Sequence, residues 1–131
     1  MAALTEISRE QLRLKIESGA AFVLVDALAP MSFAHSHLPG AINLPPEWVD
    51  ERGPRRIPDV NTEVVVYCAS STCDSSVEVG RRLIELGYRN VQHYTGGKKD
   101  WVAAGLPLEG GGRFVRYPPG VSLAQDEPTP S

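Results

Sequence analysis

The 131-residue sequence lacks the features of several large protein classes. It has only two cysteines, too few for a disulfide scaffold or for the usual cysteine-rich zinc sites. No apolar run approaches the roughly 18–20 residues that cross a bilayer. The N-terminus lacks the basic and apolar stretches of a secretory signal. We therefore expect a cytoplasmic protein with one hydrophobic core.

An excess of positive charge is also missing. The formal net charge is −3 and the pI is near 5.6, whereas nucleic-acid binders usually carry a basic stripe. Arg52, Arg55 and Arg56 come nearest to such a stripe, and we interpret them as solvated loop residues. The composition therefore predicts neither a nucleic acid nor a membrane as partner.

Short apolar runs of strand length alternate with helical patterns along the chain. Strands are expected at 21–25, 41–44, 64–67 and 90–94, and helices at about 8–17, 74–86 and 98–104. Residues 30–38 are expected to form a helical turn and a loop, and 50–61 a polar connection. The alternation predicts an α/β fold with three layers, in which helices flank a central, mainly parallel sheet.

The C-terminal segment differs from the rest in composition. Residues 109–131 hold four glycines and four prolines and show no sustained periodicity. We expect a single domain over residues 1–108, followed by an extended or partly disordered tail over 109–131.

Cys68 lies where a buried strand is expected to leave the sheet. A loop of small residues follows it, Ala69, Ser70, Ser71 and Thr72, and a helix begins directly after Cys73. Loop amides and a helix N-terminus can bring a thiol pKa down from about 8.5 into the ~3.5–7.5 range. The position favours a reactive thiolate at the bottom of a shallow bowl over the alternative, an inert buried cysteine.

Several motifs occur together in an order that resembles the rhodanese-like family. The first half of that family is matched by Leu24-Val25-Asp26 and by His37 to Asn43. The second half is matched by the strand ending at Cys68, the loop and helix after it, Leu86-Gly87-Tyr88, Val91, Gly96-Gly97 and Trp101. The resemblance runs from about Ile7 to Leu108.

This resemblance implies a sulfurtransferase that works by double displacement. Cys68 would take the outer sulfur of a donor such as thiosulfate, hold it as a persulfide, and pass it to cyanide or a thiol. A sulfur-relay protein is another possible partner, and neither a metal nor an organic cofactor is needed. The implied site comprises Cys68 as nucleophile, Ala69, Ser70, Ser71, Thr72 and Cys73 around the substrate, and Asp26, His37, Gly96 and Gly97 as supporting residues.

Three departures from the family pattern bear on the donor. The arginine that commonly follows the Asp-Val pair is missing from Asp26-Ala27-Leu28, and Ser36 replaces the usual glycine. The loop over residues 69–72 contains no lysine or arginine. Lys98 and Lys99 are the candidates to compensate, although residues at a helix start are more often solvated.

Cys73 has two interpretations. It is either a partly buried thiol at the helix start or a resolving cysteine that attacks the persulfide on Cys68, releases hydrosulfide and leaves a disulfide. The sequence leaves both open.

Three rival functions remain for comparison. A non-catalytic module that carries a persulfide or binds a partner fits the same sequence. A phosphatase or arsenate reductase is disfavoured because Asp74 occupies the place where an arginine would hold the phosphate. A zinc site formed by His35, His37, Cys68 and Cys73 is disfavoured because the two histidines fall in a loop resembling a structural segment of the family.

Overall fold

The computed structural model describes residues 3–110 and the backbone of 113–116. Its centre is a five-stranded sheet in which every pair of neighbours is parallel. The strand order is β1 (Thr5–Glu6), β5 (Asn90–Tyr94), β4 (Glu63–Tyr67), β2 (Val23–Asp26), β3 (Ile42–Asn43). The longer strands therefore occupy the middle of the sheet, and two-residue strands close its edges.

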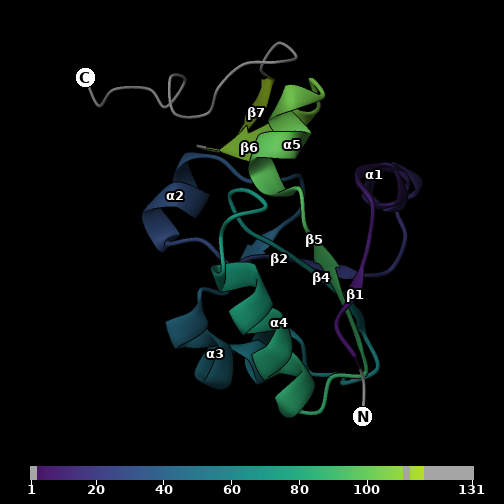
Figure 1. The fold of residues 1–131 in the computed structure, drawn as a ribbon, viewed down its shortest axis with the longest axis vertical. Helices are drawn as coiled ribbons and strands as arrows, with labels where there is room; N and C mark the ends of the chain where they lie inside the picture. The colour runs from purple at the N-terminus through teal and green to yellow at the C-terminus, as the bar shows by residue number, and fades with distance from the viewer. Residues whose placement is uncertain (1–2, 111–112, 117–131) are drawn as a thin grey trace.

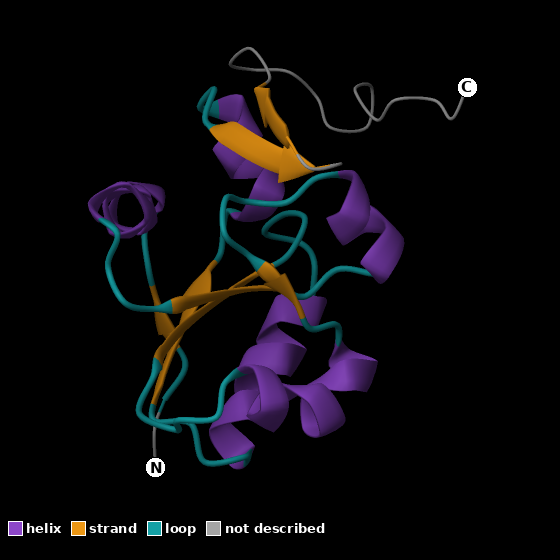
Figure 2. Cartoon of the chain, turned by 180° about the vertical axis from the view of Figure 1, so that it is seen from behind, coloured by secondary structure: helices purple, strands orange, loops and turns teal. Residues whose placement is uncertain are grey.

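Helices cover both faces of this sheet (Figures 1 and 2). One face carries α1 (Arg9–Ser18) and α5 (Gly97–Ala103), and the opposite face carries α3 (Val49–Arg56) and α4 (Ser75–Glu85). The short helices α2 (Pro30–His35) and η1 (Pro46–Trp48) lie in the connections around β3. The predicted three-layer α/β architecture is confirmed.

Strand β4 explains why both faces must be covered. Val65 and Tyr67 belong to the apolar cluster on the α1 side, whereas Val64 and Val66 belong to the cluster on the α4 side. All four are fully buried. Because each such side chain contributes about 1.5–3 kcal/mol when removed from water, this strand is firmly fixed up to the residue before Cys68.

Helix α1 forms as its local signals predict. The Ser8 hydroxyl accepts from the Gln11 amide and the Gln11 side chain accepts from the Ser8 amide, a complete capping box. The helix ends at Gly19, whose φ of 70° lies in the left-handed region. Leu12 is fully buried and anchors the helix to the sheet.

The region between η1 and β4 differs from the prediction. Residues 50–61 are not simply a polar connection, since α3 runs through Arg56 despite Pro54. Pro54 cannot donate a backbone hydrogen bond within the helix, and the buried residues Val49 and Gly53 anchor α3. A β-carbon at Gly53 would lie 3.7 Å from Leu83 Cδ2 of α4, so α3 approaches α4 closely here. In α4, the buried positions include Ser76 and Val79, whereas Val77 is only half-buried.

The expected domain boundary at Leu108 is too early. Strand β6 (Pro107–Gly110) pairs with β7 (Arg113–Arg116) in an antiparallel hairpin. Glu109 exchanges two backbone hydrogen bonds with His37, of 2.7 and 2.8 Å. Ordered structure therefore extends into the glycine-rich segment because it is paired with the loop after α2. The rest of the predicted tail, 117–131, lies outside the described residues.

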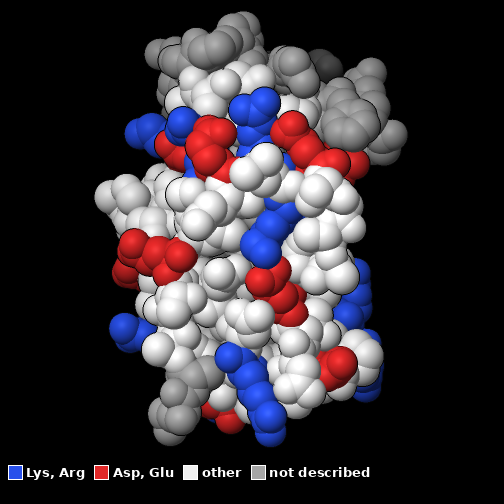
Figure 3. All heavy atoms as spheres, turned by 90° about the vertical axis from the view of Figure 1, so that its right-hand side faces the viewer, with Lys and Arg blue, Asp and Glu red and all other residues white. Residues whose placement is uncertain are grey.

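The charged side chains on the α1 side are of both signs (Figure 3). Arg9 pairs with Asp100, and Arg13 pairs with Glu17 along α1. This face shows no continuous basic stripe. Among the described residues, no helix combines the length and apolar character of a membrane span.

Candidate active site

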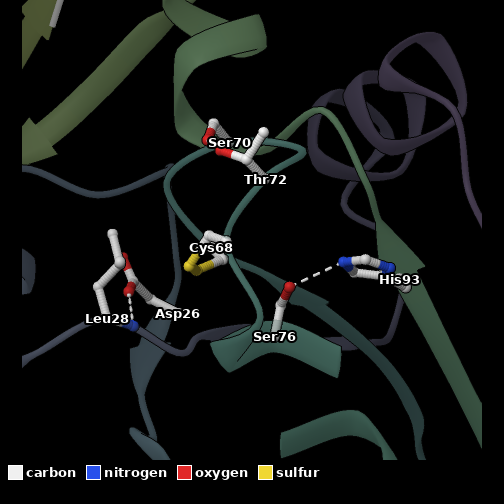
Figure 4. Close-up of a disulfide and its surroundings, with 8 residues drawn as sticks. Asp26, Leu28, Cys68, Ser70, Thr72, Ser76 and His93 are labelled. Carbon is white, nitrogen blue, oxygen red and sulfur yellow. Dashed lines mark hydrogen bonds between the residues drawn. A yellow bond between two sulfur atoms is a disulfide. The ribbon is translucent and has the colours of Figure 1, made fainter. Parts of the chain in front are cut away.

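Cys68 lies at the carboxyl edge of the sheet, where open α/β folds place their ligands. Tyr67 is in register with Asp26 of β2 and with Tyr94 of β5. The Ala27 amide donates to the Tyr67 carbonyl at 3.0 Å, which extends the pairing to the point where Cys68 leaves the sheet. The loop from Cys68 to Asp74 then leads into α4 (Figure 4).

The two cysteines of this loop are joined in a disulfide. Their α-carbons are 6.2 Å apart, and Cys68 is only 1% exposed. The prediction of an accessible sulfur in a shallow bowl is therefore wrong for this disulfide form, because Cys73 lies across the Cys68 sulfur. Cys68 belongs to neither apolar cluster, and Asp26 and Ser76 lie near it in Figure 4.

The loop amides take little part in the backbone hydrogen bonding. Among the backbone hydrogen bonds of the described residues outside helices and strands, none is donated by the N–H groups of residues 69–72. The Cys73 amide donates to the Ser70 carbonyl at 3.1 Å and closes a turn. The cradle of amides around the Cys68 sulfur stays a prediction.

Helix α5 holds the first half of the loop in place. The Lys98 amide donates to the Cys68 carbonyl at 2.9 Å, and the Lys99 amide donates to the Ala69 carbonyl at 2.8 Å. These two bonds use the N–H groups at the start of α5 that the helix itself leaves unpaired. The loop is therefore fixed near Cys68, whereas Ser71 and Thr72 remain exposed.

Gly97 allows this contact for two reasons. Its φ is +68°, in the left-handed region. A β-carbon there would lie 2.7 Å from the Cys68 carbonyl oxygen and 2.9 Å from the Ser70 amide nitrogen. At Gly96, a β-carbon would instead meet the side chain of Asp100 at 2.6 Å. The predicted close backbone approach beside the loop therefore occurs at Gly97, whereas Gly96 faces the Asp100 side chain.

Asp26 forms a buried polar network next to the loop. Its Oδ2 accepts from the Tyr67 hydroxyl at 2.6 Å, and its Oδ1 accepts from the Leu28 amide at 2.8 Å. The Tyr67 hydroxyl accepts in turn from the Leu38 amide at 2.9 Å. Burial raises the pKa of Asp26, while the Tyr67 and Leu28 hydrogen bonds and the charge of Lys98 act in the opposite direction.

Lys98 lies at the start of α5, where the sequence left two possibilities, a charge that compensates for the loop and a solvated side chain. It is only 5% exposed. Its positive charge favours the ionised form of Asp26. Lys99, the next residue, is exposed. The start of α5 therefore brings one buried lysine to a loop that contains no lysine or arginine.

Ser76 and His93 form a pair that the sequence did not reveal. Ser76 is fully buried in the first turn of α4, and its Oγ lies 2.8 Å from His93 Nε2 of β5 (Figure 4). Burial lowers the pKa of His93, with Glu6 opposing the shift. The sequence pattern gave no signal for this pair, because a serine in a first helical turn is as common on a solvated face.

The two histidines considered for zinc lie at the end of α2 and in the loop after it. The His37 ring stacks on Phe33 with centroids 3.9 Å apart, and its Nδ1 lies 2.7 Å from the Phe33 carbonyl oxygen. His35 Nε2 is buried without a hydrogen-bond partner in the described structure. Within the described ranges, no three histidine, cysteine, aspartate or glutamate residues are grouped to hold a metal.

Comparison with known proteins gives related sequences over most of the chain. Residues 8–104 match the model of the rhodanese-like domain. The chain is 33% identical over 104 residues to the thiosulfate sulfurtransferase GlpE of Haemophilus influenzae, covering 79% of this chain and 93% of that one. It is 37% identical over 76 residues to the thiosulfate sulfurtransferase PspE of Escherichia coli, covering 58% and 70%.

Solved structures agree with these sequence matches. A structure described as a rhodanese with anions from E. coli has a TM-score of 0.59 and 34% identity, covering 70% of this chain and 100% of that one. The BH2092 protein of Bacillus halodurans has a TM-score of 0.75 at 23% identity, covering 81% and 77%, and supports the fold alone. With a family match over most of its length and a fold shared with a solved rhodanese, the chain belongs to the rhodanese-like domain family.

Proposed function

We propose that the protein is a sulfurtransferase that moves sulfane sulfur from thiosulfate, or a similar donor, to cyanide or a thiol. Cys68 attacks the outer sulfur of the donor, displaces sulfite and carries the sulfur as a persulfide. The relatives named above support a sulfurtransferase of the rhodanese type. The proposal extends this class to a donor, an acceptor and a covalent intermediate.

The position of Cys68 in the fold carries its assignment as the nucleophile. Cys68 follows the most deeply buried strand and precedes a helix N-terminus, and the amides of residues 69–72 next to it donate none of the backbone hydrogen bonds outside helices and strands in the described structure. Such amides stabilise a negative charge on an attached sulfur or on a sulfonate oxygen. Asp26, His37, Gly96 and Gly97 are proposed to support the loop, and Ala69, Ser70, Ser71, Thr72 and Cys73 to surround the donor.

The positive charge for a dianionic donor is proposed to come from Lys98. The loop has no basic side chain, whereas Lys98 is buried and its amide donates to the Cys68 carbonyl. The carboxylate of Asp26 partly offsets this charge. We therefore propose that the main-chain amides provide most of the anion binding and that Lys98 provides the remainder. The protein is proposed to act in the cytoplasm, either on small sulfur compounds or with a sulfur-relay protein.

Thiocyanate production from thiosulfate and cyanide tests this function. The protein is first reduced and freed of reductant, since the disulfide blocks Cys68. In the Cys73→Ser protein, which cannot form the disulfide, we expect turnover that is abolished when Cys68 is also replaced by serine, and a mass gain of about 32 Da after thiosulfate alone. Absence of both turnover and the mass gain contradicts the proposal.

A carrier module is distinguished by the same measurements. A mass gain on Cys73→Ser without thiocyanate production by the same variant indicates a persulfide carrier that serves a dedicated acceptor. The absence of any sulfur uptake indicates a partner-binding module. Only rapid turnover that depends on Cys68 supports the enzyme.

A further inference from the structure

The disulfide between Cys68 and Cys73 links the proposed nucleophile to a second thiol in the same loop. The distance between their α-carbons, 6.2 Å, lies within the usual ~4.4–6.8 Å span for bridged cysteines. A local turn brings Cys73 back toward Cys68. The turn is closed by the Cys73 amide, which donates to the Ser70 carbonyl. The Ser70 and Thr72 hydroxyls, 3.0 Å apart, add a second contact within that turn.

The two halves of the loop differ in how they are held. Cys68 and Ala69 are fixed through their carbonyls by the first amides of α5. Ser71 and Thr72 are exposed, and Cys73 is half-buried. The second half can therefore move away from Cys68 to admit a donor and return to form the bond, while the position of Cys68 is kept.

From this arrangement we infer that the protein is a sulfane-sulfur reductase, in which Cys73 converts the sulfur held on Cys68 to hydrosulfide. The inference rests on the proposed persulfide. The Cys73 thiolate attacks the Cys68 sulfur, a bond forms between these two atoms, and the bond to the outer sulfur breaks. The outer sulfur leaves with the electron pair and the persulfide proton as HS⁻. It is reduced, and the two cysteine sulfurs are oxidised to the disulfide.

An external dithiol completes the cycle. Its first thiolate attacks the disulfide and its second closes a ring, so that it becomes oxidised and both protein thiols are restored. Access decides the direction of attack, because Cys68 is 1% exposed whereas Cys73 is half-buried. The dithiol attacks the Cys73 sulfur, and Cys68 leaves as the thiolate that the loop amides can stabilise. A dithiol–disulfide oxidoreductase is thus the class of partner that must supply the electrons.

A single turnover without added thiol tests the inference. Reduced, desalted protein receives thiosulfate under anaerobic conditions, and sulfite, hydrosulfide and intact mass are measured over time. For the wild type we expect one equivalent of sulfite, one of hydrosulfide, and a final mass about 2 Da below that of the reduced protein. For Cys73→Ser we expect sulfite release that still depends on Cys68, at a rate that can differ from that of the wild type, with a lasting gain of about 32 Da and no hydrosulfide.

The outcomes separate the inference from the function on which it rests. A wild type that keeps the added sulfur and releases no hydrosulfide overturns the inference and leaves the transferase intact. Failure of both proteins to release sulfite overturns the transferase itself. The sulfite burst of Cys73→Ser also shows that this variant is folded, so a missing hydrosulfide signal cannot be attributed to misfolding. Cys68→Ser serves as the control without sulfur uptake.

Discussion

At the scale of single residues, the buried side chain of Lys98 is the least expected feature. Burying an ammonium group costs several kcal/mol unless it is paired and hydrogen-bonded. Its charge acts on Asp26, which is itself buried and bonded to the Tyr67 hydroxyl. We therefore interpret the positive charge of Lys98 as part of the proposed anion binding at the neighbouring loop. We do not interpret it as a source of stability.

Lys98→Met is expected to lower kcat/KM for thiosulfate about tenfold, the equivalent of about 1.4 kcal/mol. The change removes the buried positive charge of Lys98, so the pKa of the Cys68 thiol should rise and the pH–rate profile should move to higher pH. Steady-state kinetics across pH on the reduced protein measure both effects.

Lys99→Met is the matched control, since it removes the same charge one residue later from an exposed side chain. Its pH–rate profile should coincide with that of the wild type. If both variants lose activity equally and without a shift in pH, the role assigned to Lys98 is wrong.

At the scale of elements, the contact between α5 and the loop from Cys68 to Asp74 links fold to chemistry. Its two hydrogen bonds come from backbone amides, so side-chain substitutions in α5 leave them in place. The contact depends on the absence of a side chain at Gly97, where a β-carbon would lie 2.7 Å from the Cys68 carbonyl oxygen.

Gly97→Ala should therefore displace the loop and reduce thiosulfate:cyanide activity by at least about tenfold, as small misplacements of reacting groups can do. The control is Gly19→Ala, which has a similar φ of +70° but nothing within 4 Å of its β-carbon. Each variant should lose about 1–2 kcal/mol of stability from the left-handed backbone. Urea unfolding and activity measured side by side would contradict the argument if Gly97→Ala kept normal activity.

Most elements could be predicted because their signals are local. The capping box at Ser8 and the buried run of β4 are set by neighbours in the chain, and both were found where expected. The α3 helix could not be predicted, because Gly53 and Pro54 resemble a helix break until Leu83 of α4 is known to lie against Gly53.

The candidate site was predictable only in part, for a related reason. Cys68 and the small-residue loop follow from the order of strand, loop and helix. The pairing of Cys73 with Cys68, the burial of Lys98 and the Ser76–His93 contact depend on distances between segments that are far apart or free to turn. Nothing in a linear pattern fixes such distances.

At the scale of the whole molecule, burial lowers the pKa of His93, with Glu6 opposing. The unfolded chain, with a histidine pKa of about 6.5, therefore takes up a proton that the folded protein resists. The free energy of unfolding should fall as the pH drops through about 6.5 toward the lower pKa of the folded state.

Urea unfolding at a series of pH values, in the wild type and in His93→Gln, isolates this contribution. The variant keeps a side chain that can bond to Ser76 but does not titrate, so its stability should depend less on pH between about 7 and 5. Parallel curves for the two proteins would contradict the assignment, since His35 and His37 are common to both.

The dependence of the loop on α5 has a consequence during synthesis. A nascent chain carries Cys68 out of the ribosome before the segment that holds its carbonyl, and β5 must pair with β4 before α5 can reach it. Until then the thiol is an ordinary one on a flexible chain. The reactivity proposed for Cys68 should therefore arise only late in translation, once the polypeptide has been extended through α5.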